Sequence, residues 1–163
     1  MAINRDKKEE ILERLKKILD KSKSITFVNF HGLSVKDTTS MRDRLREEGV
    51  GYFVSKKTLA NLALKDSKVK GDIPLFDGEL AFAFSEDDET APARKIYDFG
   101  KEFKDKLHIL GGIFEGVFKN KEEMMEIATI PSPQVLKGMF VNVINSPIQG
   151  LVIALNGIAE KKQ

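Results

Sequence analysis

The chain has 163 residues, enough for one domain of ordinary size with an appendage or for one slightly larger domain. Its 41% hydrophobic content and eleven Phe can form a core, which excludes a wholly disordered chain. It contains no Cys, so a disulfide framework and thiolate metal sites are excluded as well. Residues 1–8 lack the apolar segment of a secretory signal, so we expect a cytosolic protein.

The net charge of +2 hides a strong asymmetry between the two halves of the chain. Residues 1–70 carry 17 Lys and Arg against 10 Asp and Glu, a net charge of +7, whereas residues 71–163 carry 10 against 15, a net charge of −5. This distribution favours two different partners: a polyanion for the basic half and a protein for the other half.

Helices and strands alternate along the first 130 residues. The apolar spacing of residues 5–21 predicts an amphipathic helix. Ser34 with Asp37 three residues later predicts the start of a second helix. The remaining predicted elements are strand 24–29, turn 30–34, helix 34–49, strand 50–55, helix 56–64, strand 79–84, a helix that carries Ile96, Phe99 and Phe103, strands 107–114 and 116–118, and a helix that begins at Asn120. This alternation predicts an α/β class: a globular α/β sandwich with a mixed sheet.

The segment Ile-Pro-Ser-Pro at 130–133 is the best domain boundary, because two prolines bracket a helix-capping serine. We therefore expect an α/β domain over 1–130 and a helical segment over 131–163. Residues 138–159 of that segment carry no charge. A membrane span, a helix packed on its own domain and a docking strip for a partner would each need such apolar residues.

The spacing of these residues predicts an amphipathic helix rather than a membrane span. At 100° per residue, most of the large apolar side chains gather in one stripe, while Asn142, Asn145, Gln149 and Asn156 lie on the opposite side. The stripe contains Leu136, Phe140, Val143, Ile144, Ile148, Leu151, Leu155 and Ile158. A faint repeat of eleven residues relates the sequences at Phe140 and Leu151, and eleven residues make three turns. Pro147 predicts either two helices or one kinked helix.

Catalysis finds little support. The chain contains no phosphate-binding loop, nucleophile elbow, zinc-binding His-Glu-x-x-His or dinucleotide fingerprint. His31 and His108 are the only histidines, and neither lies near a nucleophile in sequence. The acidic run 86–89 lacks the ligand spacing of a cation loop. We predict a protein that is not an enzyme and needs no metal or cofactor.

Basic residues of the first half indicate possible phosphate contacts. Arg42 and Arg46 are one helical turn apart, and Lys56-Lys57-Thr58 falls where a strand gives way to a helix, so backbone N–H groups and cations could meet one phosphate there. On the first helix, one arc carries Lys7, Arg14, Lys17 and Lys21. Solvated helix faces are an equally good interpretation of these charges on their own.

Several segments together resemble the family of bacterial large-subunit ribosomal protein 10, the stalk-base protein related to the eukaryotic P-zero protein. The most specific is GLSVKDTTSMRDRLREEGVGYFVSKKTLANLAL (32–64), which combines a Gly-Leu-Ser turn, an Arg-rich helix, a strand and a Lys-Thr-Leu helix start. The others are LAFAFSEDDETAPARKIYDFGKE (80–102), ILGGIFEG (109–116) and INSPIQGLVIALNGIAEKK (144–162). The resemblance covers nearly the whole chain.

The resemblance implies a structural ribosomal protein whose N-terminal domain binds ribosomal RNA of the GTPase-associated region, beside large-subunit protein 11. Carried over to this chain, the RNA-binding candidates are Asn4, Arg5, Lys7, Lys8, Gly32, Leu33, Ser34, Arg42, Arg46, Lys56, Lys57 and Thr58. Lys57 stands where the family commonly has Asn.

The resemblance also implies that the C-terminal helix anchors dimers of the small acidic stalk proteins (L-seven/L-twelve), which recruit translational GTPases. The eight stripe residues are the docking candidates. Longer members of the family carry three docking segments, whereas this chain has two, near Phe140 and Leu151, so we expect two dimers. A membrane-peripheral helix is disfavoured because its polar face would carry Lys or Arg, and a nucleotide-dependent enzyme because a phosphate loop is missing.

Overall fold

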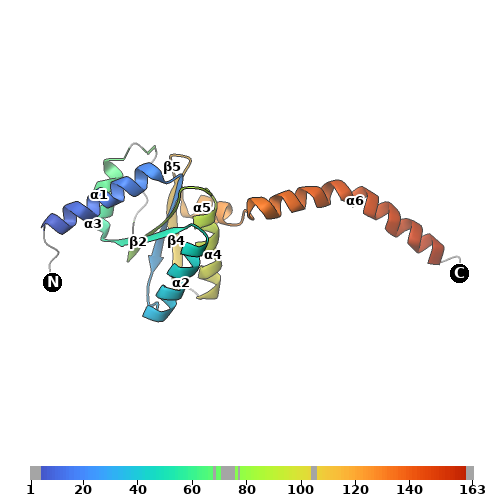
Figure 1. The fold of residues 1–163 in the computed structure, drawn as a ribbon, viewed down its shortest axis with the longest axis horizontal. Helices are drawn as coiled ribbons and strands as arrows, with labels where there is room; N and C mark the ends of the chain where they lie inside the picture. Colours follow the sequence, from blue (N-terminus) through green and yellow to red (C-terminus); the bar gives the residue numbers. More distant parts are fainter. Residues whose placement is uncertain (1–4, 68, 71–75, 77, 104–105, 161–163) are drawn as a thin grey trace. The chain divides into compact units, whose positions relative to one another are not determined.

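The computed structural model describes residues 5–67, 69–70, 76, 78–103 and 106–160. The chain divides into two compact units, Met1–Ile130 and Pro131–Gln163. The first unit is built on a five-stranded sheet with helices on both faces, and the second contains one long helix (Figure 1).

Five strands form the sheet: β1 (Ser24–Phe30), β2 (Gly51–Ser55), β3 (Leu80–Ser85), β4 (Leu107–Phe114) and β5 (Val117–Asn120). Their order is β2-β3-β1-β4-β5, and every neighbouring pair is antiparallel. The α/β class is confirmed, but the sheet is antiparallel and not mixed. β1, α2 (Val35–Glu47) and β2 make the crossover from which parallel neighbours would be expected. β3 separates the two strands and runs opposite to both.

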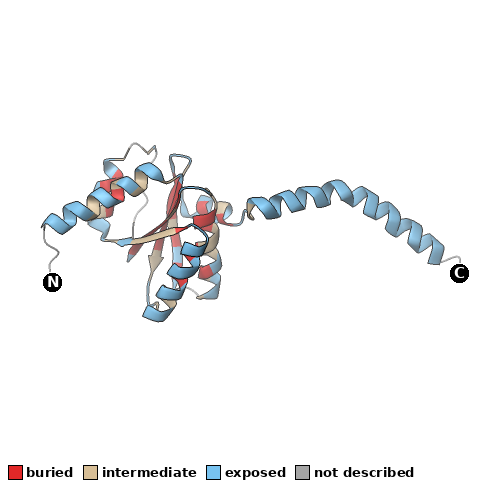
Figure 2. Ribbon diagram, viewed as in Figure 1, coloured by how far each residue is buried: buried red, intermediate tan, exposed pale blue. Residues whose placement is uncertain are grey.

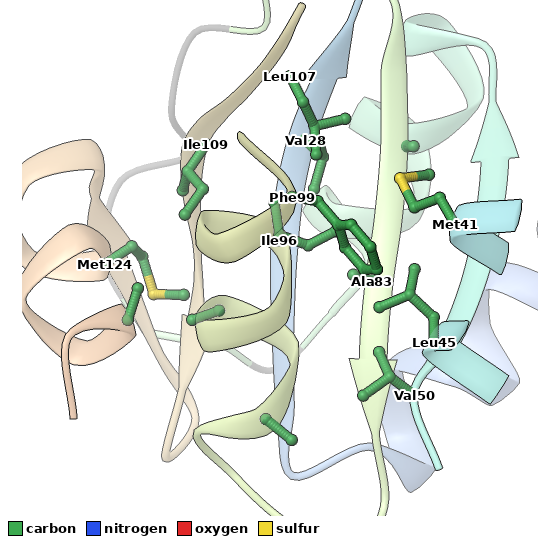
Figure 3. Close-up of a cluster of buried hydrophobic side chains, with 14 residues drawn as sticks. Val28, Met41, Leu45, Val50, Ala83, Ile96, Phe99, Leu107, Ile109 and Met124 are labelled. Atoms are coloured by element: carbon green, nitrogen blue, oxygen red, sulfur yellow. The ribbon is translucent and has the colours of Figure 1, made fainter. Parts of the chain in front are cut away.

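Each face of the sheet carries its own hydrophobic core. Helices α1 (Arg5–Lys21) and α3 (Lys57–Lys65) cover one face, where Phe27 meets Phe82 edge to face with ring centroids 5.4 Å apart. Helices α2, α4 (Ala91–Glu102) and α5 (Lys121–Ala128) cover the other face, where side chains of α2 and α4 surround Val28 and Ala83 (Figure 3). β1 is the central strand, and Ser24–Val28 are all buried (Figure 2).

Helix starts follow the local signals in the sequence. The Ser34 Oγ accepts a hydrogen bond from the Asp37 N–H at 3.1 Å, so the predicted capping of α2 is confirmed. At the start of α5, the Asn120 N–H donates to the Glu123 carboxylate at 3.0 Å, as in a capping box. These contacts satisfy backbone groups that a helix end leaves without intrahelical partners.

The second unit consists of α6 (Pro133–Glu160), which is helical throughout and contains Pro147. Figure 1 shows that this helix changes direction near its middle. Of the two alternatives at Pro147, the kinked helix is confirmed, because a proline removes one backbone donor and its ring pushes against the preceding turn. At its start, the Val135 N–H donates to the Ser132 hydroxyl at 3.4 Å.

Candidate nucleic-acid interface and exposed helix

Strand β2 forms one edge of the sheet, and its two aromatic rings each lie beside an arginine. Tyr52 and Phe53 are consecutive, so their side chains point to opposite faces of the sheet. The Arg42 Cζ, on α2, is 5.5 Å from the centroid of the Tyr52 ring, and the Arg14 Cζ, on α1, is 5.1 Å from that of Phe53. These are cation–π distances. The edge of the sheet therefore carries a guanidinium on each face.

A hollow of about 400 Å³ lies at the start of β2, and we call it the edge hollow. It is lined by Arg14, Arg42, Arg46, Gly49, Val50, Gly51, Tyr52 and Phe84. Gly51 faces Phe84 across the β2–β3 pair, and a Cβ on residue 51 would lie 2.3 Å from the Phe84 ring. Glycine is required here because only its missing side chain lets the ring lie against the strand and form a wall of the hollow.

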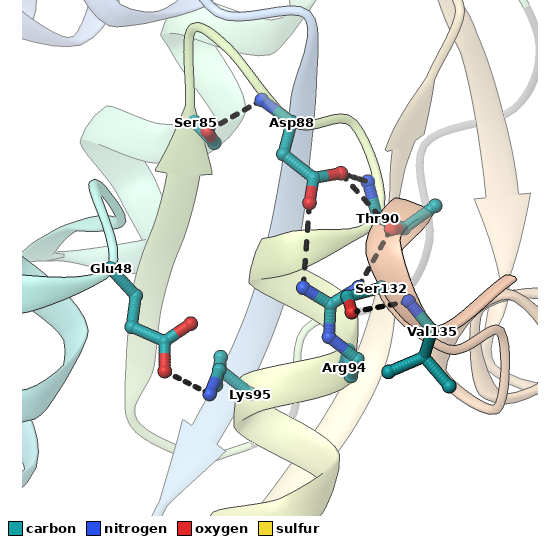
Figure 4. A network of polar contacts seen from close by, with 8 residues as sticks. All are labelled: Glu48, Ser85, Asp88, Thr90, Arg94, Lys95, Ser132 and Val135. Atoms are coloured by element: carbon teal, nitrogen blue, oxygen red, sulfur yellow. Dashed lines mark hydrogen bonds and ion pairs between the residues drawn. The ribbon is translucent and has the colours of Figure 1, made fainter. Parts of the chain in front are cut away.

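The arginines whose side chains the structure describes fall into two groups. Arg44 forms an ion pair with Glu102 at 3.2 Å, and Arg94 forms one with Asp88 at 3.4 Å (Figure 4). The remaining arginines have no carboxylate within ion-pair distance among the described residues, and they are the three that line the edge hollow: Arg14, Arg42 and Arg46. The edge hollow is thus the place where uncompensated guanidinium charge gathers.

Asp88 shows what a paired charge does elsewhere in the same unit. Burial opposes its ionisation, but hydrogen bonds from the Thr90 N–H at 2.9 Å and the Thr90 hydroxyl at 3.0 Å, together with Arg94, lower the pKa of its carboxyl (Figure 4). Lys95 also forms an ion pair with Glu48, which connects α4 to the end of α2. These contacts hold the first turn of α4 in place and leave no charge for a ligand.

Tyr52 is buried on its hydroxyl side. Burial raises the pKa of Tyr52 to about 12, and the Arg42 guanidinium opposes this rise only in part. The hydroxyl has no hydrogen-bond partner among the described residues. Tyr52 therefore stays neutral at physiological pH, and its ring, not its acidity, is what it contributes to the edge hollow.

The start of α3 carries a second cationic group. Lys56 is the N-cap residue, and its side chain makes no capping hydrogen bond. Lys56, Lys57 and Thr58 are all exposed. Lys56 and Lys57 line a hollow of about 500 Å³ whose other walls include Ile11, Phe30, Val54 and Leu59. This group lies at the end of β2 that is opposite the edge hollow, so predicted RNA contacts flank the strand at both ends.

The other predicted RNA contacts lie in different settings. Asn4 lies outside the described residues, and for Arg5 the structure describes only the backbone, in α1. Lys7 and Lys8 are exposed on α1, and Lys7 lines a small hollow with Arg14 and Phe53.

The predicted turn contacts are placed less uniformly. Gly32 is exposed with a φ of +71°, which favours glycine. Leu33 packs against the core, and the Ser34 hydroxyl is already bonded to Asp37. Leu33 and Ser34 therefore have structural tasks whether or not they touch RNA.

The second unit presents an apolar surface of its own. Every residue of α6 is exposed, and thirteen of its large apolar side chains are at least 48% exposed. Eight of these form the predicted stripe, and the helix places them as expected along one side. Five more lie off the stripe and narrow the polar side: Val135, Met139, Val141, Val152 and Ile153. The helix is more apolar around its circumference than the stripe alone suggested.

By length and composition, α6 is long and apolar enough to cross a membrane. Its most apolar 18-residue segment is fully exposed in this structure. One such helix is weak evidence by itself, because core helices of soluble proteins and signal sequences pass the same test. The Asn and Gln side chains and Pro147 interrupt the apolar run, and each polar side chain would be costly in a bilayer core.

No candidate catalytic or metal centre emerges from the described residues. No group of three or more His, Asp or Glu side chains among them lies close enough together to hold a metal ion. His31 and His108 are exposed and lie on different segments. The features of the described residues that need a functional explanation are the edge hollow, the start of α3 and the exposed α6.

Sequence reasoning missed part of the edge hollow. The sequence predicts a cationic arc on the first helix that includes Arg14, but it does not group Arg14 with Arg42 and Arg46. It indicates no role for Tyr52 or Phe84. The only sequence signal was a pair of aromatic residues in a short strand that follows two glycines. That α1 and α2 bring their arginines to the same sheet edge depends on the packing of both faces.

Comparison with known proteins identifies the family of the chain. Residues 3–101 match the family model of ribosomal protein L10. The chain is 36% identical over 160 residues to large ribosomal subunit protein uL10 of Clostridium tetani, covering 98% of this chain and 92% of that protein. It is also 36% identical over 162 residues to large ribosomal subunit protein uL10 of Fusobacterium nucleatum, covering 96% and 95%. The chain therefore belongs to the ribosomal protein L10 family, a family of structural proteins of the large ribosomal subunit, ribosomal and cytoplasmic in bacteria, and not of enzymes.

Proposed function

We propose that this chain forms the base of the large-subunit stalk. Its first unit (1–130) binds ribosomal RNA of the GTPase-associated region, beside large-subunit protein 11. Its second unit (131–163) anchors two dimers of the small acidic stalk proteins, which recruit translational GTPases. One observation carries the proposal: guanidinium groups that have no ion-pair partner among the described residues gather at the edge of β2, while the exposed apolar α6 has no charge between Gly138 and Ala159.

The placement of cations supports RNA binding by the first unit. Arg14, Arg42 and Arg46 meet at one end of β2, and Lys56 and Lys57 lie at its other end. Contacts to phosphates dominate affinity for nucleic acid, and guanidinium forks fit phosphate oxygens better than isolated charges do. An acidic protein partner would also attract these residues, but it would not need two groups separated by the length of a strand.

The surface of α6 supports docking of protein partners. Full burial of each apolar stripe side chain contributes about 1.5–3 kcal/mol, so eight contribute more than about 10 kcal/mol before the costs of association. A contiguous apolar surface made of eight large exposed side chains is typical of an interaction site. Pro147 divides the stripe, with Phe140 before the kink and Leu151 after it. Each half of α6 therefore presents one docking segment, which supports two dimers.

Native mass spectrometry of the tagged full chain, purified from its own cells, tests the docking half of the proposal. We expect four copies of a small acidic protein with each chain. Six copies would contradict the two-dimer count, and no copies would contradict docking altogether. Binding of the purified chain to lipid vesicles in place of a protein would favour the membrane alternative for α6.

Affinity for a transcript of the GTPase-associated rRNA segment tests the RNA half. The double variant Arg42→Ala/Arg46→Ala should weaken binding and reduce the slope of log K against log salt by about 1–2, because each phosphate contact releases bound counterions. Arg44→Ala, on the same helix but paired with Glu102, is the control and should leave the slope nearly unchanged. Equal loss in both variants would show that the edge hollow has no special part in binding.

A further inference from the structure

The edge hollow combines three arginines with two aromatic residues and has no carboxylate in its lining. The hollow between α2 and α4, for comparison, is lined by charges of both signs, among them Arg44, Glu48, Lys95 and Glu102, and ion pairs neutralise them. In the edge hollow the three guanidinium groups have no described carboxylate partner. A ligand for it should therefore carry negative charge.

The lining of the edge hollow fits a ligand that has a flat apolar part as well as a phosphate. The half-buried rings of Phe84 and Tyr52 supply apolar surface beside the arginines. The hollow measures about 400 Å³, which falls in the range of small-molecule pockets. A phosphate group alone has no flat apolar face to place against a phenyl ring, whereas a nucleobase has one and stacks on aromatic side chains.

Backbone groups of the turn before the edge strand, and of its first residue, also line this hollow. Gly49, Val50 and Gly51 form part of its lining, and the two glycines have no side chains to cover the main chain. In the described residues no strand pairs with the outer side of β2. The Gly49 and Val50 N–H groups already donate to the Arg46 and Leu45 carbonyls. The open side of an edge strand presents further N–H and C=O groups, and the polar edge of a base can form hydrogen bonds with these.

We infer that the edge hollow receives one unstacked nucleotide of the bound RNA. Its base lies against the Phe84 ring, and its flanking phosphates are held by Arg14, Arg42 and Arg46. The assignment rests on the proposed RNA-binding function. A free nucleotide shares this chemistry, so the test contains an arm that separates the two sources.

The first arm of the test replaces an arginine by lysine, which keeps the positive charge but removes the planar guanidinium group. Arg42→Lys keeps the charge but loses the planar fork and its fit on the Tyr52 ring, and we expect about a tenfold loss of affinity for the rRNA transcript with little change in salt slope. Arg44→Lys is the matched control, because Arg44 lies on the same helix and pairs with Glu102. It should lose less than about twofold. Equal losses would overturn the part given to Arg42.

The second arm detects the base itself. Each unpaired nucleotide of the transcript is replaced in turn by an abasic one, and affinity is measured for the unchanged chain and for Phe84→Leu. We expect one position where removal of the base weakens binding about tenfold for the unchanged chain and less than threefold for Phe84→Leu. The second effect is smaller because, without the Phe84 ring, the base has already lost its stacking partner. Phe103→Leu controls for general loss of packing, because Phe103 is another half-buried Phe and lies away from the edge hollow, at the C-cap of α4.

The outcomes separate the inference from the function on which it rests. If the unchanged chain does not bind the transcript above its non-specific level, both fail. If it binds but no abasic position is coupled to Phe84, RNA binding stands and the nucleotide assignment is wrong. If nucleoside 5′-monophosphates at millimolar concentration raise the melting temperature of the chain and that coupling is absent, the hollow takes a free nucleotide, and the RNA assignment is overturned.

Discussion

Gly51 and Phe84 face each other across strands β2 and β3, with the Phe84 ring in the space that a side chain at residue 51 would occupy. A Cβ there would lie 2.3 Å from the ring, so a larger residue at position 51 would force the Phe84 ring to move. The contact shapes the wall of the edge hollow. It therefore connects a backbone requirement of the fold with the surface proposed to bind RNA.

Gly51→Ala should lower the free energy of unfolding by about 1–3 kcal/mol, because the added methyl group overpacks the site and displaces the ring. Chemical denaturation followed by circular dichroism measures this change. The double variant Gly51→Ala/Phe84→Leu should cost less than the sum of the two single changes, since the smaller side chain removes the clash. Strict additivity of the two costs would show that Phe84 does not restrict residue 51.

Ser34→Ala should destabilise the first unit by about 1 kcal/mol, because the Asp37 N–H loses its capping acceptor. Ser40→Ala provides the control, since Ser40 is an exposed residue inside the same helix, where Ala is the better helix former. The control should be neutral or slightly stabilising in the same denaturation experiment. An Ser34→Ala variant as stable as the unchanged chain would mean that solvent caps α2 equally well.

Acid should weaken the first unit partly through Asp88. The folded-state pKa of its carboxyl lies below the ordinary value of 3.8, so its stabilising effect is present above that value and is lost as the pH falls through the folded pKa. We expect this contribution to the free energy of unfolding to begin to fall as the pH approaches 3.8 from above, and to go on falling below it. The Asp88→Asn variant should show a shallower fall than the exposed control Asp87→Asn. Identical pH profiles for the two variants would show that Asp88 does not contribute to the loss of stability in acid.

The two halves of α6 should lose their partners independently. Phe140→Asp places a charge in the stripe before Pro147 and should remove one dimer, leaving two copies of the small acidic protein per chain in native mass spectrometry. Leu151→Asp should do the same for the second half, and both changes together should remove all four copies. Asn142→Asp and Asn156→Asp, on the polar side, are matched controls that should keep four. Loss of all copies from either single change would indicate one continuous site.

Pro147 should set the bend of α6. Because the chain has no Cys, Gln134→Cys and Ala159→Cys provide the only two labelling sites for distance measurement by pulsed electron paramagnetic resonance. Pro147→Ala restores a backbone donor and relieves the ring contact, so the helix should straighten and the distance between labels should increase. The far-ultraviolet helical signal should not fall. An unchanged distance would mean that another feature of the helix causes the bend.

Much of the fold follows from local signals. Period and turn chemistry predicted all five strands and the helices close to their observed bounds, and the caps at Ser34 and Asn120 began helices where expected. The mixed sheet was wrong for a physical reason. Alternating elements predict the crossover from β1 to β2, but no local pattern shows that a third strand will lie between them, since pairing depends on contacts distant in sequence.

The sequence by itself determined the character of the two surfaces: a basic first half, an uncharged apolar C-terminal segment, and the proline that bends it. Composition and helical period are local properties of the sequence, so they do not depend on tertiary contacts. Only the tertiary structure decided where the charge is concentrated. Arg14 comes from one face of the sheet and Arg42 from the other, and packing of both cores brings them to the same end of β2. The Tyr52 ring joins them on the edge strand, whose outer flank is open in the described residues. The Phe84 ring, on β3, reaches the same place because Gly51 has no side chain to exclude it.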